Sequence, residues 1–278
     1  MPTGDAHVHL FADGFSGTYG RLLHDETFLY EELRKNFGIE RALVVGYEGE
    51  TAYLGNTAHI LALARDRHWI APLAYLPSQP APSLESLRQH RDGGAIGYSL
   101  YLSDALGARA VAAWPQAVMR ELQAQRAIVS FNATPAATAA IAPFIDALDE
   151  CTFLFSHLGL PGRFPQTPTP QEAATRLQPL LALAGRQNVA VKLSGLYAIT
   201  EPCHDFPHAA ARAVVDAVLG SFGPGRLCWG SDFAPALDFV SFGQLADDRL
   251  LADLSASERE AVMGENLDRL LPPPRERE

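Results

Sequence analysis

Short apolar runs rich in β-branched and aromatic residues recur along the chain, and longer segments rich in alanine and leucine separate them. This alternation is typical of repeated strand–helix units around a parallel sheet. Eight such runs can be counted, over residues 5–11, 41–47, 69–75, 95–102, 127–133, 152–158, 189–195 and 226–232. Helical spacing predicts helices near 25–36, 52–66, 83–91, 110–125, 135–148, 170–186 and 207–222, with further helices between 240 and 270.

Eight strands, each followed by a helical segment, predict a (β/α)8 TIM barrel in this chain of 278 residues. The rival fold, an open doubly wound sheet, needs a glycine-rich phosphate loop after the first strand, and the glycines of residues 11–20 lack its spacing. We expect one barrel domain over 1–271 and a disordered tail over 272–278, because prolines and charges contribute no packed face. The irregular segment 12–40 is expected to include a loop that covers the barrel mouth.

Charge and cysteine content narrow the class of partner. The chain has 22 Lys and Arg against 32 Asp and Glu, and the net charge of -10 opposes attraction to nucleic acid or an anionic membrane. No run approaches the ~18 apolar residues of a membrane span, and the start lacks a secretory signal pattern. The three cysteines, Cys151, Cys203 and Cys228, are far apart, as in reduced cytosolic proteins. We expect a cytoplasmic protein that binds a small molecule, and a homo-oligomer stays open.

Two histidines, His7 and His9, stand in the first apolar run. Side chains two positions apart on a strand share one face, so both are predicted to project into the barrel near its carboxyl end. The active sites of this fold lie at that end, and paired imidazoles there can reach one metal ion at roughly 2.1 Å. The alternative is a pair of polar core residues satisfied by hydrogen bonds.

Two more polar residues close later strands. His157 emerges from the sixth run in FSHLG, and Asp232 ends the eighth run in WGSDF. Taken alone, His157 could be a structural histidine and Asp232 a helix N-cap. A buried carboxylate needs a cation or hydrogen-bond donors, however, and chance poorly explains four such residues at one mouth. The pattern therefore predicts a shared site.

The seventh run places Lys192 and Ser194 on one strand face. A lysine inside a barrel is normally paired with a carboxylate or used chemically, since burying a lone ammonium is costly, and we favour pairing. Four further residues stand at strand ends and could line a substrate pocket: Glu48, Tyr98, Tyr101 and Asn132. The aromatic ones have an alternative, because aromatic residues in barrels commonly belong to the core.

The segments DAHVHLF, FSHLGLPG, VKLSGLY, WGSDF and ENLDRLL occur in this order over nearly the whole chain. With them the chain resembles the amidohydrolase superfamily, specifically the amidohydrolase-related branch of 2-pyrone-4,6-dicarboxylate hydrolases and sugar-acid lactonases. The resemblance implies a barrel in which His7, His9 and Asp232 form the core of the site. It further implies that His157 polarises the substrate or positions water, and that Asn266 has a structural role.

Departures from the family pattern limit what the resemblance implies. Metal-dependent relatives usually add a lysine or glutamate on strand 4 or a histidine on strand 5, whereas the pyrone dicarboxylate hydrolases work without a metal. One divalent ion, most readily zinc, held by His7, His9 and Asp232 is therefore one expectation, and a metal-free site is the other. Those hydrolases hold two carboxylates with arginines, one of which usually lies where this chain has Tyr98. Arg163 could still bind one carboxylate. Because an arginine that those hydrolases use is missing here, a less charged lactone is favoured.

Three hypotheses follow for function. The first is a hydrolase that opens a small sugar-acid or pyrone-type lactone with water, Asp232 acting as general base and His157 stabilising the oxyanion. The second is a metal-dependent non-oxidative decarboxylase, which needs a tightly held ion. The third is a barrel without catalysis that binds a ligand or serves as a scaffold, against which the clustered polar residues argue. The residues expected to bind substrate are Arg163, Tyr98, Asn132, Lys192 and Ser194.

Overall fold

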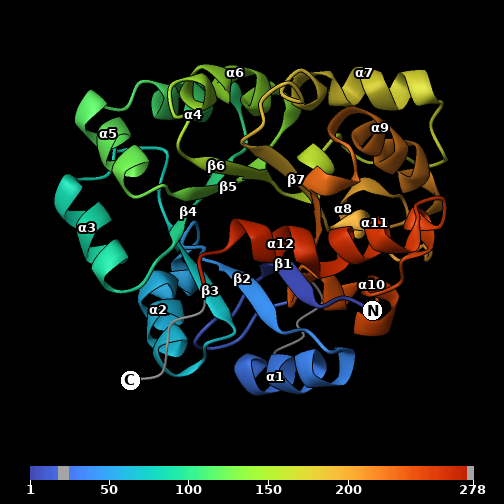
Figure 1. The fold of residues 1–278 in the computed structure, drawn as a ribbon, viewed down its shortest axis with the longest axis horizontal. Coiled ribbons are helices and arrows are strands. Elements are labelled where there is room, and N and C mark those ends of the chain that lie inside the picture. The colour runs from blue at the N-terminus through green and yellow to red at the C-terminus, as the bar shows by residue number, and fades with distance from the viewer. Residues whose placement is uncertain (18–24, 274–278) are drawn as a thin grey trace.

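The computed structural model, which describes residues 1–17 and 25–273, contains a nearly closed barrel of eight parallel strands (Figure 1). The strands pair in chain order, each parallel to the next. Their bounds are β1 (Gly4–Val8), β2 (Arg41–Val45), β3 (Ile70–Tyr75), β4 (Gly97–Leu102), β5 (Ile128–Ala133), β6 (Thr152–Phe155), β7 (Val189–Leu193) and β8 (Leu227–Trp229). The predicted (β/α)8 barrel is confirmed.

The barrel closes between its first and last strands. Val8 forms a parallel bridge to Phe233, and Asp232 N donates a hydrogen bond to His7 O across 2.8 Å. Gly230 allows this close approach, because a Cβ at that position would lie 2.9 Å from both the backbone N and the Cβ of His7. Closure therefore places the first histidine beside the turn that follows β8.

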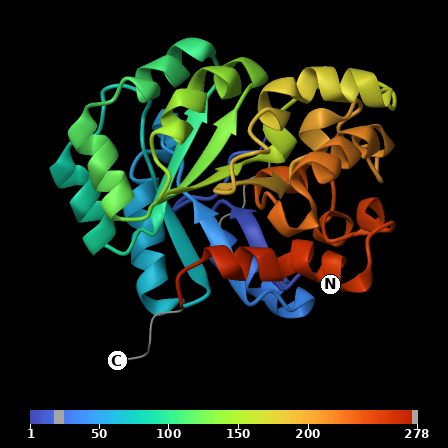
Figure 2. The same cartoon turned by 45° about the horizontal axis from the view of Figure 1, so that its top comes forward.

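Helices cover the outside of the barrel (Figures 1 and 2). They are α1 (Glu26–Phe37), α2 (Asn56–Asp66), α3 (Leu84–Asp92), α4 (Ala105–Ala112), α5 (Gln116–Ala124), α6 (Pro135–Asp146), α7 (Pro170–Leu181), α8 (Leu196–Ile199), α9 (Arg212–Phe222), α10 (Phe242–Leu245), α11 (Ala256–Glu260) and α12 (Asn266–Leu270). Within residues 1–17 and 25–273, none of the helices has the length and apolar character that a membrane span requires.

Alternate strand residues separate two buried apolar layers. The outer layer packs strand residues such as Val44 and Val191 against the helices. The inner layer is closed at the amino end of the barrel by Leu267 and Leu271, because α12 crosses that end (Figure 2). The strand residues of the inner layer are Ala6, Leu43, Val45, Ala71, Leu73, Ile128, Leu154, Ala190 and Cys228. Apolar packing thus occupies the amino end, which leaves the carboxyl end for polar side chains.

Some expected boundaries differ from the observed ones. The single helix expected over 110–125 is two helices, α4 and α5, because Pro115 precedes α5 and its ring provides no N–H to continue a helix. Within the expected loop region, residues 18–24 lie outside the described residues, as do residues 274–278 of the expected tail. Pro272, the first residue of the expected tail, accepts a hydrogen bond from Arg41 at 2.7 Å.

Candidate active site

An irregularity in β1 positions the first two histidines. Beyond Asp5 the register of β1 against β2 shifts, as in a β-bulge, a feature that re-aims side chains and leaves a backbone group unpaired. The buried Asp5 carboxylate satisfies that group, since Oδ1 accepts from His7 N at 3.1 Å and from Ser231 N at 2.8 Å. Its Oδ2 accepts from Tyr30 at 2.8 Å. Asp5 therefore joins the strand that carries His7 to the turn that carries Asp232.

His7 and His9 are buried, and their Nε2 atoms lie 3.1 Å apart. His9 Nδ1 lies 2.9 Å from Val45 O, which can only accept, so the Nδ1 atom carries the proton of a neutral ring. His7 Nδ1 lies 3.1 Å from Lys192 Nζ and 3.2 Å from Ser156 Oγ. Burial lowers the pKa of both imidazoles, that of His9 to about 4, so both rings are neutral near pH 7.

His157 begins a short 3₁₀ turn after β6, with a positive φ of 54° that is costly for a residue with a side chain. Gly195 makes room for the ring, because a Cβ at that position would clash with His157 Nδ1. Ser194 Oγ accepts from His157 N at 3.3 Å and lies 3.1 Å from Nδ1. Burial lowers the pKa of His157 to about 3, so this ring too is neutral.

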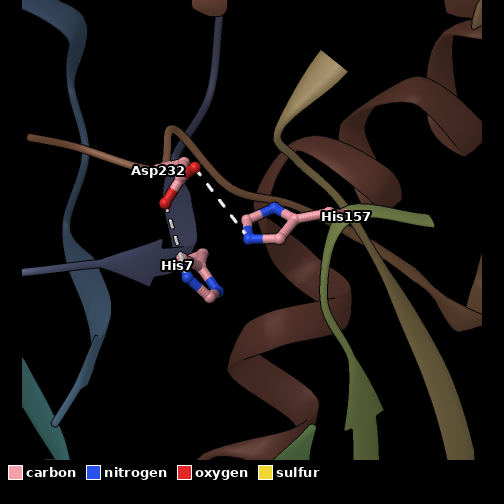
Figure 3. Close-up of side chains that lie close together, drawn as sticks. All are labelled: His7, His157 and Asp232. Atoms are coloured by element: carbon pink, nitrogen blue, oxygen red, sulfur yellow. Dashed lines mark ion pairs between the residues drawn. The ribbon is translucent and has the colours of Figure 1, made fainter. Parts of the chain in front are cut away.

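Asp232 also has a positive φ, 55°, and its carboxylate faces the three histidines. Oδ1 lies 3.5 Å from His7 Nε2 and 3.8 Å from His9 Nε2. Oδ2 lies 3.9 Å from His157 Nε2. Figure 3 shows the rings of His7 and His157 approaching the carboxylate from different sides. Oδ2 also accepts a 2.6 Å hydrogen bond from Tyr197. Burial raises the pKa of Asp232 to about 6.

The helix N-cap alternative for Asp232 finds no support in this geometry. The short turn over Pro235–Asp238 begins after Ala234 and has no side-chain cap. The carboxylate instead meets groups from β1, from the turn after β6 and from α8, so the four polar residues nominated by their strand-end positions lie together.

These residues fit a single divalent ion. The ligand atoms of His7, His157 and Asp232 lie within 4.8 Å of one another, and His9 adds a nitrogen 3.1 Å from that of His7. Ligands about 2.1 Å from a tetrahedral zinc ion lie about 3.4 Å apart, close to the separations of Asp232 Oδ1 from His7 on β1 and from His9 just after it. The bond from His9 Nδ1 to a carbonyl is the kind of contact that orients metal-binding imidazoles.

Lys192 lies behind His7 and is fully buried. Its Nζ donates to Ser130 Oγ at 2.7 Å and lies 3.1 Å from His7 Nδ1. In the described part of the chain no carboxylate forms an ion pair with Lys192, so the expected pairing with an acidic residue is wrong. Lys192 instead contacts a hydroxyl group and an imidazole. Burial lowers the pKa of Lys192 to about 7.

Two residues expected to bind substrate lie elsewhere. Tyr98 is on the helix-facing side of β4, where its hydroxyl oxygen lies 2.9 Å from Leu87 O and 2.7 Å from Gln125 Oε1, two acceptors for its single proton. Tyr98 is therefore a core residue, and the expectation that it binds substrate is wrong. Arg163 is half-exposed and pairs with Glu201 at 3.2 Å, so the structure does not bring its guanidinium to Asp232.

Asn132 and Glu48 have different surroundings. Asn132 is half-buried and lies two residues beyond Ser130 on β5, so it shares the interior face towards the carboxyl end. Glu48 Oε1 accepts from Thr57 N at 2.7 Å, in the first turn of α2, which is a helix-stabilising contact. Of these two, Asn132 therefore remains a candidate to contact a substrate.

An aromatic cluster beside His9 was largely missed by sequence reasoning. Tyr101, one of the strand-end candidates, has its hydroxyl 3.4 Å from His9 Nε2, and the ring of Phe11 stacks on His9 with centroids 5.7 Å apart. Phe11 in turn stacks on Tyr53 at 4.1 Å. Ring contacts join the remaining members, and we call the set the tyrosine wall: Tyr47, Tyr53, Tyr75 and Tyr101.

Tyr197 was missed as well, although it ends the VKLSGLY segment. The available signal was its position in that segment, shortly after Lys192 on β7 and Ser194 just beyond the end of that strand. The short helix α8 was not expected, so the position of Tyr197 in that segment did not by itself show that its hydroxyl turns towards Asp232.

A (β/α)8 barrel with an H-x-H pair on its first strand, a histidine after the sixth and an aspartate after the eighth defines an enzyme of the amidohydrolase class. The chain belongs to the Amidohydrolase family, whose family model matches residues 5–272. No curated protein matches the chain in a sequence search.

Solved structures share this fold at low sequence identity. An amidohydrolase from Burkholderia multivorans with bound zinc has a TM-score of 0.80 at 24% identity, covering 98% of this chain and 100% of that one. A probable 2-pyrone-4,6-dicarboxylic acid hydrolase from Acinetobacter baumannii with citric acid bound has a TM-score of 0.73 at 15% identity, covering 97% and 99%. A 2,6-dihydroxybenzoate decarboxylase from Rhizobium has a TM-score of 0.66 at 13% identity, covering 97% and 98%.

Proposed function

We propose that this enzyme hydrolyses the ester bond of a small, weakly charged lactone of the sugar-acid type. The observation that carries the proposal is the environment of Asp232. Its carboxylate is buried, accepts a hydrogen bond from Tyr197 and lies within 4 Å of three imidazole nitrogens. A carboxyl group whose pKa is raised to about 6 is suited both to accept and to return a proton at neutral pH.

In the proposed reaction Asp232 takes a proton from a water molecule as the water oxygen bonds to the lactone carbonyl carbon. The carbonyl oxygen becomes an oxyanion, and its return to a carbonyl breaks the bond between that carbon and the ring oxygen. Asp232 then returns the proton to the leaving alkoxide. Water and lactone are consumed, and the open hydroxy acid is the product.

His157 is the proposed donor to the oxyanion. Ser194 Oγ accepts the backbone N–H of His157, and its own proton is free to bond to Nδ1. The ring proton is then on Nε2, the nitrogen that faces Asp232 across 3.9 Å. A preorganised donor in this position stabilises the charge that develops on the substrate oxygen.

A divalent ion, with zinc as our expectation, would be held by His7, His9 and Asp232, which leaves the Nε2 proton of His157 available as a donor. When bound, such an ion polarises a carbonyl group and lowers the pKa of water. The zinc in the Burkholderia multivorans structure supports this choice of ion. The proton transfers assigned to Asp232 do not depend on it.

The side chains around the site favour a weakly charged substrate. Arg163 is engaged by Glu201, and the described cation that contacts the cluster, Lys192, is enclosed behind His7. The tyrosine wall and Asn132 instead offer ring faces, hydroxyl groups and an amide, which suit a ligand with several hydroxyl groups. Within residues 1–17 and 25–273, no guanidinium group contacts the cluster around Asp232 to partner the two charges of a pyrone dicarboxylate.

The test is a panel of aldonolactones and pyrone carboxylates, assayed with added zinc and separately with a chelator. We expect turnover of an aldonolactone, and Asp232→Asn should lower kcat by about 10²- to 10⁴-fold with little change in KM, the range of lost acid–base catalysis. Asp146→Asn, which makes the same chemical change at an exposed carboxylate paired with Arg186, should leave kcat unchanged. Near-normal turnover by Asp232→Asn would refute the assigned role.

Metal-dependent decarboxylation is the second candidate, favoured by the metal-ligand spacing of His7, His157 and Asp232. The panel therefore includes 2,6-dihydroxybenzoate, the compound after which the structurally similar Rhizobium decarboxylase is named. Carbon dioxide release that stops on chelation, with no lactone turned over, would replace the hydrolase proposal with this one.

A further inference from the structure

The hydrogen bonds around His7 form a continuous chain in which each donor meets an acceptor. At one end, Val45 O can only accept, so His9 Nδ1 donates to it across 2.9 Å. A neutral His9 then has its lone pair on Nε2, and His7 Nε2 lies 3.1 Å from that atom. Two facing lone pairs would repel, so this contact requires a proton on His7 Nε2.

Lys192 completes the chain on the other side of His7. With its proton on Nε2, a neutral His7 ring accepts at Nδ1, and Lys192 Nζ lies 3.1 Å from that nitrogen. The amine donates a further N–H to Ser130 Oγ at 2.7 Å. Lys192 is fully buried, and among the described residues no carboxylate pairs with it, so its amine is directed at the imidazole and the hydroxyl.

Metal binding through His7 would require the opposite arrangement. An ion on Nε2 needs the lone pair of that nitrogen, which moves the ring proton to Nδ1. There the proton would face Lys192, whose ammonium form has N–H groups and no lone pair to accept it. Ser156 Oγ, 3.2 Å from Nδ1, is the acceptor left to receive it. The lysine therefore opposes an ion at His7, even though the spacing of the surrounding ligand atoms suits one.

We propose that Lys192 holds His7 in the tautomer protonated on Nε2, and that this contact weakens the binding of a divalent ion at the site. Lys192 is then a positioning residue that acts through His7, rather than a substrate-binding residue. In this tautomer His7 points an N–H at the space between His9 and Asp232. The inference rests on contacts within the protein and goes beyond the choice of substrate.

Zinc affinity of the chelator-stripped full-length protein, measured by calorimetry, tests the proposal. Lys192→Met keeps the length of the side chain and removes its N–H groups. We expect this variant to bind zinc about 10- to 100-fold more tightly than the wild type, the range over which partners of ligating histidines act. Ser130→Ala, the matched control, keeps the lysine and should stay near the wild-type affinity. A folded Lys192→Met protein with unchanged or weaker zinc binding overturns the proposal.

A second variant separates tautomer control from simple loss of charge. In the Lys192→Met background, Ser156→Ala removes the acceptor that a proton on His7 Nδ1 would need, and we expect it to cancel most of the gain in zinc affinity. A gain that persists in full in the double variant would contradict the tautomer argument.

A measurement on the wild-type protein needs no change at Lys192. Long-range ¹H–¹⁵N spectra of metal-free protein with ¹⁵N-labelled histidine distinguish the two neutral tautomers, and the His7 signals are assigned by their loss in His7→Gln. A proton on Nε2 of His7 supports the proposal. A proton on Nδ1 overturns it, whatever the variants show.

Discussion

Tyr197 donates a 2.6 Å hydrogen bond to Oδ2 of Asp232, and its ring stacks on Phe239 with centroids 4.7 Å apart. Tyr197→Phe keeps the stacked ring and removes the donor. We expect kcat for the lactone to fall by about 10-fold or more, because a hydrogen bond to a charged group contributes about 1.5–3 kcal/mol. KM should change little. Steady-state kinetics on the substrate found in the panel measure both values.

Tyr98→Phe is the matched control for that prediction. It removes a buried hydroxyl from the helix-facing side of β4, and with it the single O–H donor that Leu87 O and the Gln125 amide oxygen both face. We expect a loss of about 1–2 kcal/mol in the free energy of unfolding and an unchanged kcat. If Tyr98→Phe lowers kcat as much as Tyr197→Phe does, the hydrogen bond to Asp232 is not the cause.

The contrast between Tyr98 and Tyr101 shows where sequence reasoning at the residue scale ends. Both stand in the same apolar run, three positions apart, so they lie on opposite faces of the strand. Strand periodicity separates them but does not say which face looks inward. The neighbours decide: Ser99, on the same face as Tyr101, bonds across the barrel to Gly46 O. His7, His9, His157 and Asp232 could be nominated earlier because buried polar groups at strand ends have few other uses.

At the scale of elements, the eight strands could be predicted because fully buried parallel strands read as short apolar runs. The register shift in β1 could not be predicted. It depends on Asp5 accepting hydrogen bonds from His7 and Ser231, and Ser231 is more than two hundred residues away in sequence. The break between α4 and α5 was readable in principle, since Pro115 stands at the start of the second helix.

The turn after β7 gives the prediction that belongs to this scale. Gly195 has a φ of 62°, and a Cβ added there would clash with the ring of His157. Gly195→Ala should displace that ring and lower kcat by about 10²-fold, the cost typical of a misplaced reacting group. Steady-state kinetics and the near-ultraviolet circular dichroism of the folded variant measure the effect.

Gly38 provides a control with the same backbone strain. It has a φ of 75° at the end of α1, and an added Cβ would meet nothing within 4 Å. Gly38→Ala should therefore cost about 1 kcal/mol of unfolding free energy, with normal kcat. If both alanine variants lose activity equally, the strain rather than the contact with His157 is responsible, and the interpretation of Gly195 is wrong.

At the scale of the whole molecule, the carboxyl end of the barrel holds the candidate site and the amino end holds apolar packing. The carboxyl end holds the polar cluster around Asp232, and several of its residues adopt costly backbone conformations. The amino end is closed by α12, whose Leu267 packs on the inner apolar layer. This division is usual for the fold, in which active sites lie at the carboxyl end and the opposite face contributes stability.

A substitution at Asn266 tests whether the amino end of the barrel contributes to stability without affecting catalysis. Its side-chain amide is buried at the start of α12 and donates to Pro224 O at 2.7 Å and to Leu227 O at 2.6 Å, at the entry to β8. Asn266→Ala leaves both carbonyl groups without this donor, and we expect a loss of about 2–3 kcal/mol in the free energy of unfolding, measured by chemical denaturation. Because β8 reaches Asp232 only at its far end, kcat should stay within twofold.

Asp268→Ala, an exposed change on the same helix, is the control and should alter the free energy of unfolding by less than about 0.5 kcal/mol. A large fall in kcat for Asn266→Ala without a fall in stability would show instead that the two ends are coupled through β8.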